Sequence, residues 1–432
     1  MSLRRLLYTL LLYLIFPFVI LKLLWRSLSN SAYRQRIHER LGFVTLDSNK
    51  PVIWVHAVSV GETIAAKPLI EALISHYPDY RILVTTTTPT GSDRVKSLFS
   101  KRVAHVYYPY DLPEIIYRFL KRIKPQILII VETEIWPNLY AACHKRHIPI
   151  VIVNARLSKK STHSYAKIKA LVAETLSYVK TIAVRSNDDA MSFKQLGASE
   201  DIIQISGNIK FDIEPDQEQI KQGKERRKQW GENRPVWVAA STHEGEDEKL
   251  LAIYNSLLKV YPDLLFILIP RHPERFNKVY ELCLSYQFSS KNKQLNTKRH
   301  TQISQYQDTN ANIIIGDSMG EMQSWFATAD VVFMGGSLVE TGGHNPLEAI
   351  AQGVPVVSGQ YIFNFEDIVK ELEQSDLLYV CQTEAEIESK ILALLKLSSA
   401  SEFTEFQFKA KKIMKQQQGV TARLMKIISS FL

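Results

Sequence analysis

The sequence predicts an α/β protein with two doubly wound parallel sheets, preceded by an apolar helix. Apolar runs of strand length alternate with helix-length segments in two successive sets after residue 50, and continuous β-branched runs of this kind are typical of parallel strands buried on both faces. The length of 432 residues suits two or three domains. The composition, 46% hydrophobic and 22% charged, is that of a globular protein and excludes wholesale disorder.

The N-terminal residues predict a membrane helix. Leu6–Leu21 carries no charge, and together with the apolar residues up to Trp25 it would cover roughly 30 Å as a helix, which is the hydrocarbon thickness of a bilayer. Pro17 is expected to kink this helix. Residues 1–50 contain eight basic and two acidic residues, so most of the formal charge of +9 lies at this end.

Three interpretations of this segment compete. A signal peptide is disfavoured because no small-residue cleavage site follows the apolar run. Between a helix that spans the bilayer and one that lies in its interface, we favour the spanning helix. The excess of Lys and Arg after the run would place the protein body on the cytoplasmic side. In either case we expect the following basic side chains to face anionic headgroups: Arg26, Arg34, Arg36 and Arg40.

Residues 31–213 form the first expected α/β domain after an anchor of residues 1–30. Pro68 is expected to kink the first helix of this domain or to delay its start. The expected strands are Val52–Val58, Arg81–Thr87, Val103–Tyr108, Gln126–Val131, Pro149–Asn154 and Thr181–Arg185. The expected helices include Ala65–His76, Asp111–Lys124 and Asp188–Leu196.

Residues 214–432 form the second expected domain. The polar stretch Glu214–Arg234 is interpreted as a linker followed by the first helix of this domain, and Ser289–Gln307 as an exposed loop or insertion. The expected strands are Val236–Ala240, Leu264–Pro270, Ala311–Gly316, Asp330–Gly335 and Val354–Ser358. In doubly wound sheets ligands bind beyond the carboxyl ends of the strands, so motifs that follow strands are the candidate functional segments.

The first such motif is His56-Ala57-Val58-Ser59-Val60-Gly61-Glu62-Thr63, a strand that runs through a turn of small residues into a helix. Gly61 would permit a ligand to approach the backbone closely. Glu62, at the start of the helix, could accept a proton from an alcohol as a general base. A carboxylate at this position also complements the helix dipole without any catalytic role, and the pattern alone leaves both interpretations open.

The second motif is Glu132-Thr133-Glu134-Ile135-Trp136-Pro137-Asn138, which also follows a buried strand. Two carboxylates two residues apart resemble a pair of metal ligands. No Asp-x-Asp motif accompanies them, and His144 and His147 are interpreted as solvated side chains of a basic helix. We therefore expect no metal.

The remaining motifs lie mainly in the second half. Arg271 follows a strand and offers a fork of donors suited to phosphate, although a surface salt bridge is the alternative. Asn345, Pro346 and Glu348 predict a capping box at a helix start, and the glycine pairs before it are typical of an anion site. Further loops rich in groups that approach anions are Gly207–Asp212 and Ser241–Gly245. The segment Gly316–Glu321 ends another expected strand and begins another helix.

Cysteine and charge usage exclude other classes. Cys143, Cys283 and Cys381 lie far apart, which excludes a disulfide scaffold and a thiolate zinc site and fits a reducing compartment. The basic excess is confined to one end of the chain, whereas nucleic-acid-binding proteins spread basic stripes over their body. We therefore expect no nucleic-acid partner.

Taken together, these segments resemble the 3-deoxy-D-manno-oct-2-ulosonic acid (Kdo) transferases of lipopolysaccharide synthesis. The resemblance extends from the N-terminal helix to at least Gly359. Eight ordered motifs carry it, namely HAVSVGE, ETEIWPN, NARLS, GNIKFD, STHEGE, PRHPERF, GDSMGEM and GGSLVETGGHNPLEA.

The resemblance implies a GT-B glycosyltransferase, in which two Rossmann-like domains face a cleft. It implies transfer of Kdo from CMP-Kdo to the 6′-hydroxyl of a tetra-acylated lipid A precursor (lipid IVA), with inversion and with no metal or cofactor. It implies an enzyme of the bacterial inner membrane whose catalytic domains lie on the cytoplasmic side and whose N-terminal helix contacts lipid.

The resemblance also assigns roles to residues. Glu62 matches the catalytic base. The segments that match the CMP-binding positions are Pro270 and Arg271, Met319, Gly320 and Glu321, and Asn345, Pro346, Leu347 and Glu348. Further expected contacts with donor or acceptor are Ser59, Gly61, Glu132, Lys210, Ser241 and His243.

Two alternatives stay open on the sequence. One is another membrane-associated GT-B transferase with a UDP-sugar donor. The other is a membrane-tethered binding module that has lost catalysis.

Overall fold

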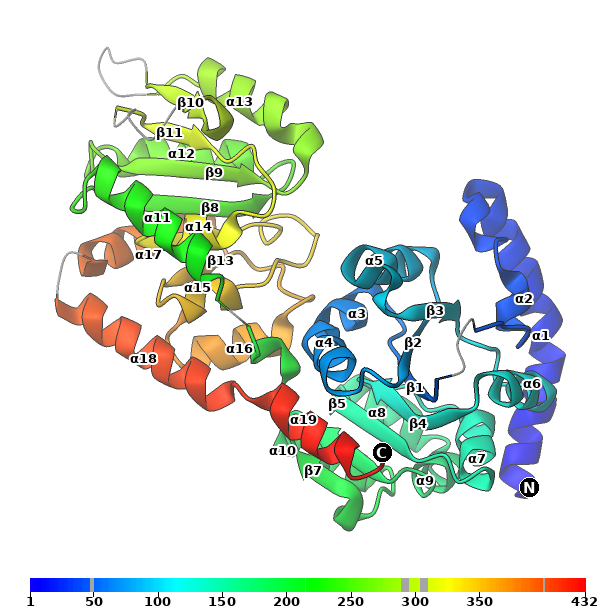
Figure 1. The fold of residues 1–432 in the computed structure, drawn as a ribbon. Coiled ribbons are helices and arrows are strands. Elements are labelled where there is room, and N and C mark those ends of the chain that lie inside the picture. The colour runs from blue at the N-terminus through cyan, green and yellow to red at the C-terminus, as the bar shows by residue number, and fades with distance from the viewer. Residues whose placement is uncertain (47–49, 214, 289–294, 304–309, 399–400) are drawn as a thin grey trace. The chain divides into compact units, whose positions relative to one another are not determined.

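The computed structural model describes all residues except 47–49, 214, 289–294, 304–309 and 399–400 (Figure 1). The chain divides into two compact units. Unit 1 consists of Met1–Asp212 together with Gln417–Leu432, and unit 2 consists of Ile213–Gln416. The expected second domain of residues 214–432 is therefore wrong at its end, because the last helix packs its apolar face into the core of unit 1.

Unit 1 contains a parallel sheet of seven strands in the order β3-β2-β1-β4-β5-β6-β7. All five residues of β1 are buried, as expected for a central strand covered on both faces. The short edge strand β7 is not among the expected strands, because its Ile-Gln-Ile sequence is half exposed and offers no continuous apolar run. The strands are β1 (Val52–His56), β2 (Arg81–Thr86), β3 (Ala104–Tyr107), β4 (Pro125–Val131), β5 (Ile150–Ala155), β6 (Thr181–Val184) and β7 (Ile203–Ile205).

Helices of unit 1 follow the expected pattern. Pro68 is the second residue of α4, where a backbone N–H would have no partner within the helix, so its absence does not destabilise the helix. The expected single helix is accordingly divided into α3 and α4. The helices are α1 (Leu3–Ser29), α2 (Ile37–Arg40), α3 (Val60–Ala65), α4 (Lys67–His76), α5 (Pro89–Phe99), α6 (Pro113–Ile123), α7 (Pro137–Lys145), α8 (Lys159–Ala166), α9 (Lys169–Leu176), α10 (Asn187–Gln195) and α19 (Val420–Ser429).

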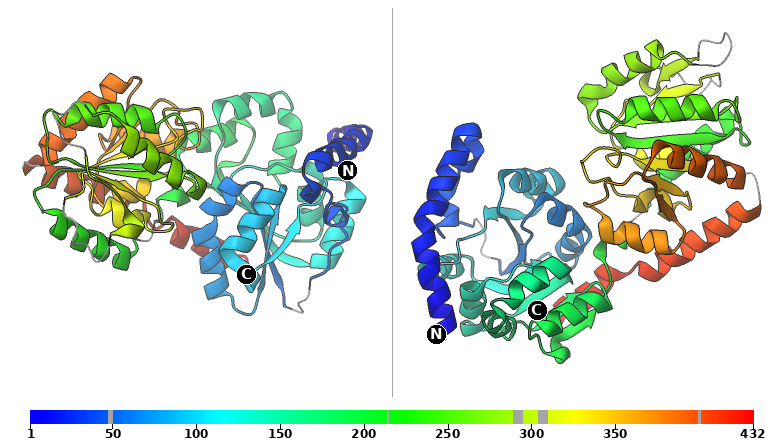
Figure 2. Two further views of the ribbon diagram at one scale, coloured as in Figure 1. Left: turned by 90° about the horizontal axis from the view of Figure 1, so that it is seen from above. Right: turned by 180° about the vertical axis from the view of Figure 1, so that it is seen from behind.

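Helix α1 lies along one side of unit 1 (Figure 2). It runs through Pro17 without interruption. An 18-residue window within its segment Leu3–Leu28 has a mean hydropathy of 2.2, and the segment is long and apolar enough to cross a membrane. One face is nevertheless bound to the unit by polar contacts, since the Tyr8 hydroxyl donates to Asp111 and the Thr9 hydroxyl to Asn138.

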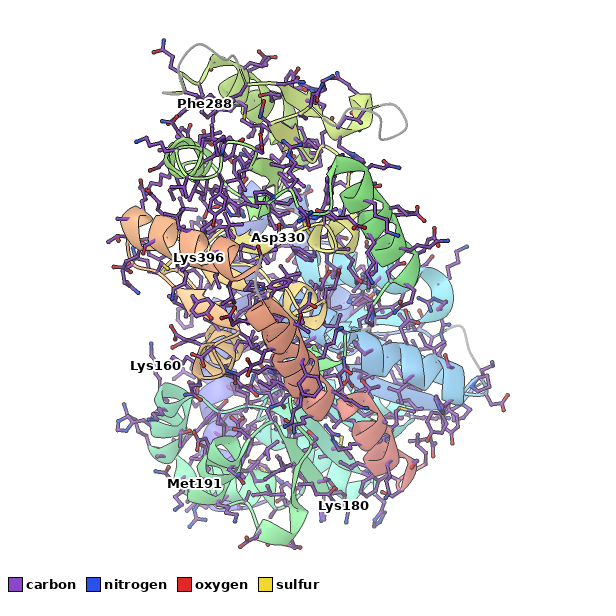
Figure 3. The ribbon with its side chains drawn as sticks, turned by 90° about the vertical axis from the view of Figure 1, so that its left-hand side faces the viewer. Lys160, Lys180, Met191, Phe288, Asp330 and Lys396 are labelled. Atoms are coloured by element: carbon purple, nitrogen blue, oxygen red, sulfur yellow. The ribbon has the colours of Figure 1, made fainter. Side chains whose placement is uncertain are left out.

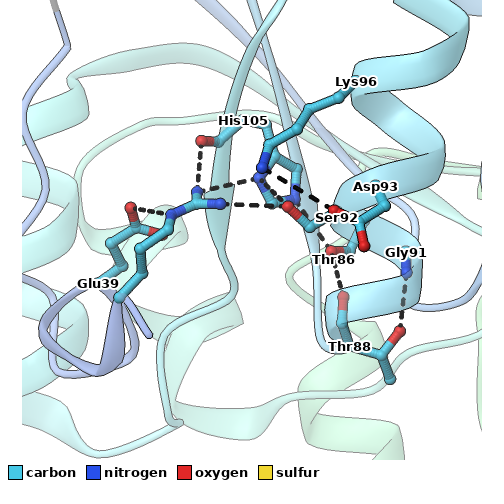
Figure 4. Close-up of polar contacts among 9 residues, drawn as sticks. Glu39, Thr86, Thr88, Gly91, Ser92, Asp93, Lys96 and His105 are labelled. Carbon is cyan, nitrogen blue, oxygen red and sulfur yellow. Dashed lines mark hydrogen bonds and ion pairs between the residues drawn. The ribbon is translucent and has the colours of Figure 1, made fainter. Parts of the chain in front are cut away.

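The basic segment after α1 differs from the expectation. Arg26 and Arg34 are exposed, but Arg36 and Arg40 point into unit 1. Arg36 donates to the carboxylate of Glu39, to the Ser92 hydroxyl and to the carbonyl of His105, in the network of Figure 4. Arg40 is 5% exposed, donates to the Thr87 carbonyl and lies over the ring of Tyr107. These two cations therefore fasten α2 to the sheet and do not face lipid headgroups.

Unit 2 contains a second parallel sheet of seven strands, in the order β10-β11-β9-β8-β12-β13-β14. Its two edge strands are not among the expected strands, because edge strands need no apolar run buried on both faces. The strands are β8 (Val236–Thr242), β9 (Leu265–Pro270), β10 (Thr297–Arg299), β11 (Ile313–Ile315), β12 (Val331–Met334), β13 (Val356–Ser358) and β14 (Leu378–Val380).

The helices of unit 2 include the expected one after the linker, α11 (Gln217–Trp230). Asp330, labelled in Figure 3, lies at the start of β12. Arg227 of α11 donates to Asp330, which also accepts the Val236 N–H and so fixes the start of β8 beside that of β12. The other helices are α12 (Asp247–Leu257), α13 (Phe276–Ser285), α14 (Met322–Phe326), α15 (Leu347–Ala351), α16 (Glu366–Gln374), α17 (Glu384–Ser398) and α18 (Ser401–Gln417).

The expected loop Ser289–Gln307 is wrong at its centre. Thr297–Arg299 forms strand β10, which pairs with β11, and His300–Gln302 forms a 3-10 turn. Residues 289–294 and 304–307 of this interpretation lie outside the described residues.

The C-terminal helix α19 is fixed to unit 1 at its first turn. The carboxylate of Asp212 accepts the N–H groups of Gly419, Val420 and Thr421. Three buried residues of the helix, Val420, Leu424 and Ile428, join the core that lies under α4. A negative side chain thus satisfies the free N–H groups of this helix start.

Replacing Asp212 by Ala is expected to destabilise α19 by about 1–2 kcal/mol, because three N–H groups lose their acceptor. Hydrogen exchange of residues 419–429 in the full chain measures this loss, with Asp79→Ala on the exposed surface of the same unit as control. Unchanged protection of α19 in the Asp212 variant would contradict the assignment of this cap.

Each sheet reverses its strand order beside its first strand. In unit 1 this reversal lies between β1 and β4, and in unit 2 between β8 and β12. Ligands of doubly wound sheets bind at such switch points, outside the carboxyl ends of the strands. The loops of interest are therefore those that begin at residues 57 and 132 in unit 1 and at residues 243 and 335 in unit 2.

Candidate active site

Glu62 lies at the switch point of unit 1, in the first turn of α3. Its Oε2 accepts the Val58 N–H at 2.8 Å and its Oε1 accepts the Ser59 hydroxyl at 2.9 Å. Ser59 in turn accepts the Glu62 N–H, so the two side chains cap the helix reciprocally. An ionised carboxylate has about four acceptor positions. The Val58 N–H, the Ser59 hydroxyl and the Ser59 N–H use up to three of them, which leaves one for a hydroxyl donor.

Two further carboxylates come from the end of β4, which pairs with β1. Burial and the negative charge of Glu132 raise the pKa of Glu62 to about 7. Burial and the charge of Glu62 raise the pKa of Glu134 to about 7 as well. Glu132 itself has a φ of 61°, a left-handed conformation that is unusual for this residue type and marks a constrained turn. The structure thus brings Glu62, Glu132 and Glu134 into one electrostatically coupled group.

The neighbouring loops explain the other residues expected in this unit. A Cβ added at Gly61 would meet only the Ser59 hydroxyl, at 3.8 Å, so the fold itself does not require a glycine there. Lys210 lies in the 3-10 turn Ile209–Phe211, whose first N–H donates to the side chain of Asn154 at the end of β5. Lys210 is therefore held at the carboxyl edge of the same sheet.

In unit 2 the buried carboxylate of Glu246 joins the two loops at the switch point. It accepts the N–H of His243 from the loop after β8, and the N–H groups of Gly336, Ser337 and Leu338 from the loop after β12. Its side chain is 0% exposed. Within the first glycine pair, the Gly336 N–H is thus bound by a carboxylate of the protein itself, and the Gly335 N–H donates to the carbonyl of Ala240. Neither N–H group is free to bind an external anion.

Three histidines and an arginine surround this junction. His243 and His344 are in hydrogen-bond contact through their Nε2 atoms at 2.8 Å, and the ring of His272 lies edge-on to His243 at 5.4 Å. Arg271 follows β9, and its N–H donates to the carbonyl of Thr242 at the end of β8. Ser241 has a φ of 59°, and a Cβ at Gly335 would come within 2.5 Å of its carbonyl, so this approach requires a glycine.

The expected capping box before α15 forms only in part. The side chain of Asn345 accepts the N–H of Leu347, as expected, but the helix begins at Leu347 and not at the buried Pro346. Glu348 is then the second helical residue instead of the third. Burial raises its pKa.

The segment Met319-Gly320-Glu321 follows β11, at the same carboxyl edge of the sheet. Met319 is 59% exposed, and Gly320 has a φ of 84° with open space where a Cβ would lie. Glu321 pairs with His300 at 3.1 Å and approaches Arg226 at 3.6 Å. Contacts within the unit therefore orient this carboxylate.

Within the described residues no group of three or more His, Cys, Asp or Glu side chains is arranged to hold a metal ion. The three cysteines are free and buried.

Comparison with known proteins decides the family. Residues 35–213 match the family model of 3-deoxy-D-manno-octulosonic-acid transferase (kdotransferase), and residues 238–412 match that of glycosyl transferases group 1. A 3-deoxy-D-manno-octulosonic acid transferase of Haemophilus influenzae is 40% identical over 431 residues, which is 99% of each chain. The chain belongs to the Kdo transferase family. It is accordingly a glycosyltransferase that transfers Kdo.

A further relative agrees with this assignment. The Kdo transferase of Bordetella pertussis is 34% identical over 74% of this chain and 73% of its own. The solved C-terminal CMP-Kdo binding domain of WaaA from Acinetobacter baumannii is 34% identical, covers 46% of this chain and 98% of its own, and superposes with a TM-score of 0.40. The UDP-GlcNAc 2-epimerase of Neisseria meningitidis, bound to UDP-GlcNAc, is 13% identical over 88% of this chain and 100% of its own with a TM-score of 0.53, which shows the shared fold.

Some residues of these two sites in the Kdo transferase cannot be identified from the sequence pattern. The pattern suggests Glu134 only as a metal ligand. Glu246 and His344 lie within the motifs given above, but no spacing rule distinguishes a carboxylate that binds a distant loop from one on the surface. Only their position in the chain offers a signal. Glu134, Glu246 and His344 each lie in a segment that follows a strand at a switch point.

Proposed function

We propose that this Kdo transferase moves Kdo from CMP-Kdo to the 6′-hydroxyl of a tetra-acylated lipid A precursor, with inversion, without a metal, and with Glu62 as the general base. The observation that carries the proposal is the state of Glu62: a carboxylate at the switch point of unit 1, largely buried, with a pKa of about 7 and one acceptor position to spare. A general base works best when its pKa lies near the working pH.

The reaction requires one proton acceptor. The acceptor hydroxyl gives its proton to the Glu62 carboxylate as its oxygen forms a bond to the anomeric carbon of Kdo. The bond from that carbon to the phosphate oxygen breaks, and its electron pair leaves with CMP. The hydrogen bonds from Val58 and Ser59 hold the carboxylate in one orientation, so that little reorganisation accompanies the transfer.

The donor is assigned to unit 2. Arg271 offers a charged fork to the phosphate, and its backbone is fixed to the end of β8. Pro270 is buried at the end of β9 and sets the start of this loop. Glu348, half-buried in the first turn of α15, is suited to accept hydrogen bonds from the ribose hydroxyls. CMP departs as an ionised phosphate and needs cationic donors but no acid.

Mass spectrometry of the product tests this assignment. The purified protein is incubated with the tetra-acylated precursor and either CMP-Kdo or a panel of UDP-sugars. We expect a mass increase of Kdo only with CMP-Kdo. Turnover with a UDP-sugar and none with CMP-Kdo would refute the proposed donor.

The pKa of Glu62 predicts the pH dependence. Because the base must be ionised to accept a proton, kcat/KM is expected to fall as the pH drops below about 7, by about tenfold per pH unit. Measurement of kcat/KM from about pH 5 to about pH 9 would show this decrease on the acidic side. A flat profile down to pH 5 would contradict the role of a carboxylate with a raised pKa.

We further propose that the enzyme lies on the cytoplasmic side of the inner membrane, with α1 in the membrane interface and not across the bilayer. The support is the row of polar contacts along α1: Ser2 donates to Glu174, Tyr8 to Asp111 and Tyr13 to Glu114. These residues cover roughly 17 Å of the helix. A spanning helix would carry their carboxylate partners into the hydrocarbon, which is costly. The outward face is apolar, with exposed leucines such as Leu7, Leu10 and Leu14.

Cysteine labelling tests this orientation, because the native cysteines are buried. Leu3 and Leu28 are 70% and 84% exposed, near opposite ends of α1. With Leu3→Cys or Leu28→Cys, an impermeant maleimide is expected to label both variants in inverted inner-membrane vesicles and neither in right-side-out vesicles. Labelling of the two positions from opposite sides would indicate a spanning helix.

A further inference from the structure

Two histidines at the switch point of unit 2 form a contact that the transfer mechanism above does not use. The Nε2 atoms of His243 and His344 are 2.8 Å apart, and the ring planes are inclined by only 10°. His243 belongs to the loop after β8, and His344 belongs to the loop between β12 and α15. The pair therefore connects the two loops between which a doubly wound sheet binds its ligand.

The contact limits how many protons the pair can hold. A neutral imidazole has one N–H and one lone pair, so one ring must donate its Nε2–H to the Nε2 of the other. The accepting ring then carries its hydrogen on Nδ1. One added proton, on an Nδ1 atom, keeps this hydrogen bond and makes the pair an imidazolium–imidazole. A second proton would place two N–H groups against each other, so the pair takes up at most one.

The surroundings favour a neutral pair until an anion arrives. Burial, the partner histidine and the nearby Arg271 and His272 lower the pKa of His344 to about 4. Burial also lowers the pKa of His243, where His272, Arg275 and Arg271 oppose its charge and Glu246 favours it.

Two acids near the pair are already engaged. The carboxylate of Glu246 is bound by four backbone N–H groups, and that of Glu244 pairs with Lys278. The other groups whose charges act on the pair are Arg271, His272 and Arg275, all of which oppose a positive charge on it.

We propose that His243 and His344 form a proton-sharing pair that binds the anionic phosphate of the donor nucleotide and takes up a proton as that anion binds. This inference rests on the proposed CMP-sugar donor and adds to it a specific anion receptor beside Arg271. The receptor consists of an N–H of the protonated pair and the guanidinium of Arg271. Donor binding is thereby coupled to proton uptake, and the release of CMP is coupled to proton loss.

Calorimetric titration of the full chain with CMP tests the coupling. Measurements at one pH in buffers of different ionisation enthalpy give the number of protons taken up per CMP bound. The secondary ionisation of CMP is the same for all variants, so the difference between wild type and His344→Gln isolates the contribution of the pair. Glutamine keeps a neutral hydrogen-bonding group but cannot be protonated. His163→Gln, at an exposed position of α8, is the matched control.

We expect wild type and the His163 variant to take up more protons than His344→Gln, by up to one per CMP. As the pH rises, the CMP affinity of wild type should fall relative to that of the variant, by up to tenfold per pH unit, over the range in which the free pair is neutral and the bound pair is protonated. Cytidine, which lacks the phosphate, should show no such difference. If wild type and His344→Gln took up equal numbers of protons per CMP, the proposed receptor would be wrong but the assignment of CMP-Kdo as donor would be unaffected. If wild type did not bind CMP, the donor assignment would be wrong as well.

A second measurement needs no variant. In wild type labelled with ¹⁵N-histidine, the free enzyme should show one ring of the pair protonated on Nδ1 and the other on Nε2. On addition of CMP, both should shift toward imidazolium values. The spectra of the CMP complex are recorded between about pH 6 and 7, near the ordinary pKa of histidine. If both rings stayed neutral there, the proposal would be overturned.

Discussion

Replacing Glu62 by Gln is expected to lower kcat with CMP-Kdo and the lipid acceptor by about 10²–10⁴-fold, because the amide cannot take the proton of the attacking hydroxyl. The amide oxygen can still accept one of the two cap hydrogen bonds. The fold should therefore persist, with a loss of about 1 kcal/mol or less in the free energy of unfolding. Steady-state kinetics and thermal unfolding of the same preparation measure the two effects separately.

Two control variants separate catalysis from capping. Ser59→Ala removes the reciprocal cap but leaves the carboxylate, and it is expected to cost about 1 kcal/mol in stability with a much smaller loss of rate. Glu71→Gln alters a carboxylate of the neighbouring helix α4, bonded to Arg102, and should leave the rate unchanged. If Glu62→Gln kept the wild-type rate, or lost no more than Ser59→Ala, Glu62 would be a helix cap and not the base.

Replacing Glu246 by Ala is expected to destabilise unit 2 by about 4 kcal/mol, because four backbone N–H groups lose their acceptor in a buried site. At about 2–4 °C per kcal/mol, the thermal unfolding midpoint of this unit should fall by roughly 10 °C. Glu246→Gln retains one oxygen, which can serve two of the four donors, and should lose about half as much. Calorimetry of the full chain measures both variants.

Glu248, an exposed residue in the first turn of the adjacent helix α12, provides the matched control. Glu248→Ala is expected to change the stability by less than about 0.5 kcal/mol. Equal effects of the two alanine variants would show that the bonds of Glu246 to Gly336, Ser337 and Leu338 do not hold the two loops together.

The sequence predicts the central strands well, because burial on both faces forces continuous apolar runs. The expected ends of β1 and β4 lie within two residues of the observed ones. The edge strands β7, β10 and β14 escape prediction, because an exposed edge relaxes that requirement. The C-terminal helix is expected in the wrong unit, since its apolar face shows that it packs but does not show against what.

For the site, residues with nearby partners in the sequence can be predicted and residues with distant partners cannot. Local chemistry identifies Glu62 and its cap, because all the partners lie within four residues. The burial of Arg36 and Arg40 is not predictable in this way, because their partners lie far along the chain, at Ser92 and Thr87. The role of Glu246 escapes prediction for the same reason, because its partners lie about ninety residues further on. Whether a charged side chain is a surface group or an internal tether depends on such distant partners.

Because the last helix returns to unit 1, unit 2 is topologically an insertion between Asp212 and Gln417. The chain must pass between the units at two places. An exchange of unit 2 among related transferases would therefore need two splice points and the retention of the host's own C-terminal helix. A chimera joined at a single point near residue 213 would bring a foreign final helix to the core of unit 1.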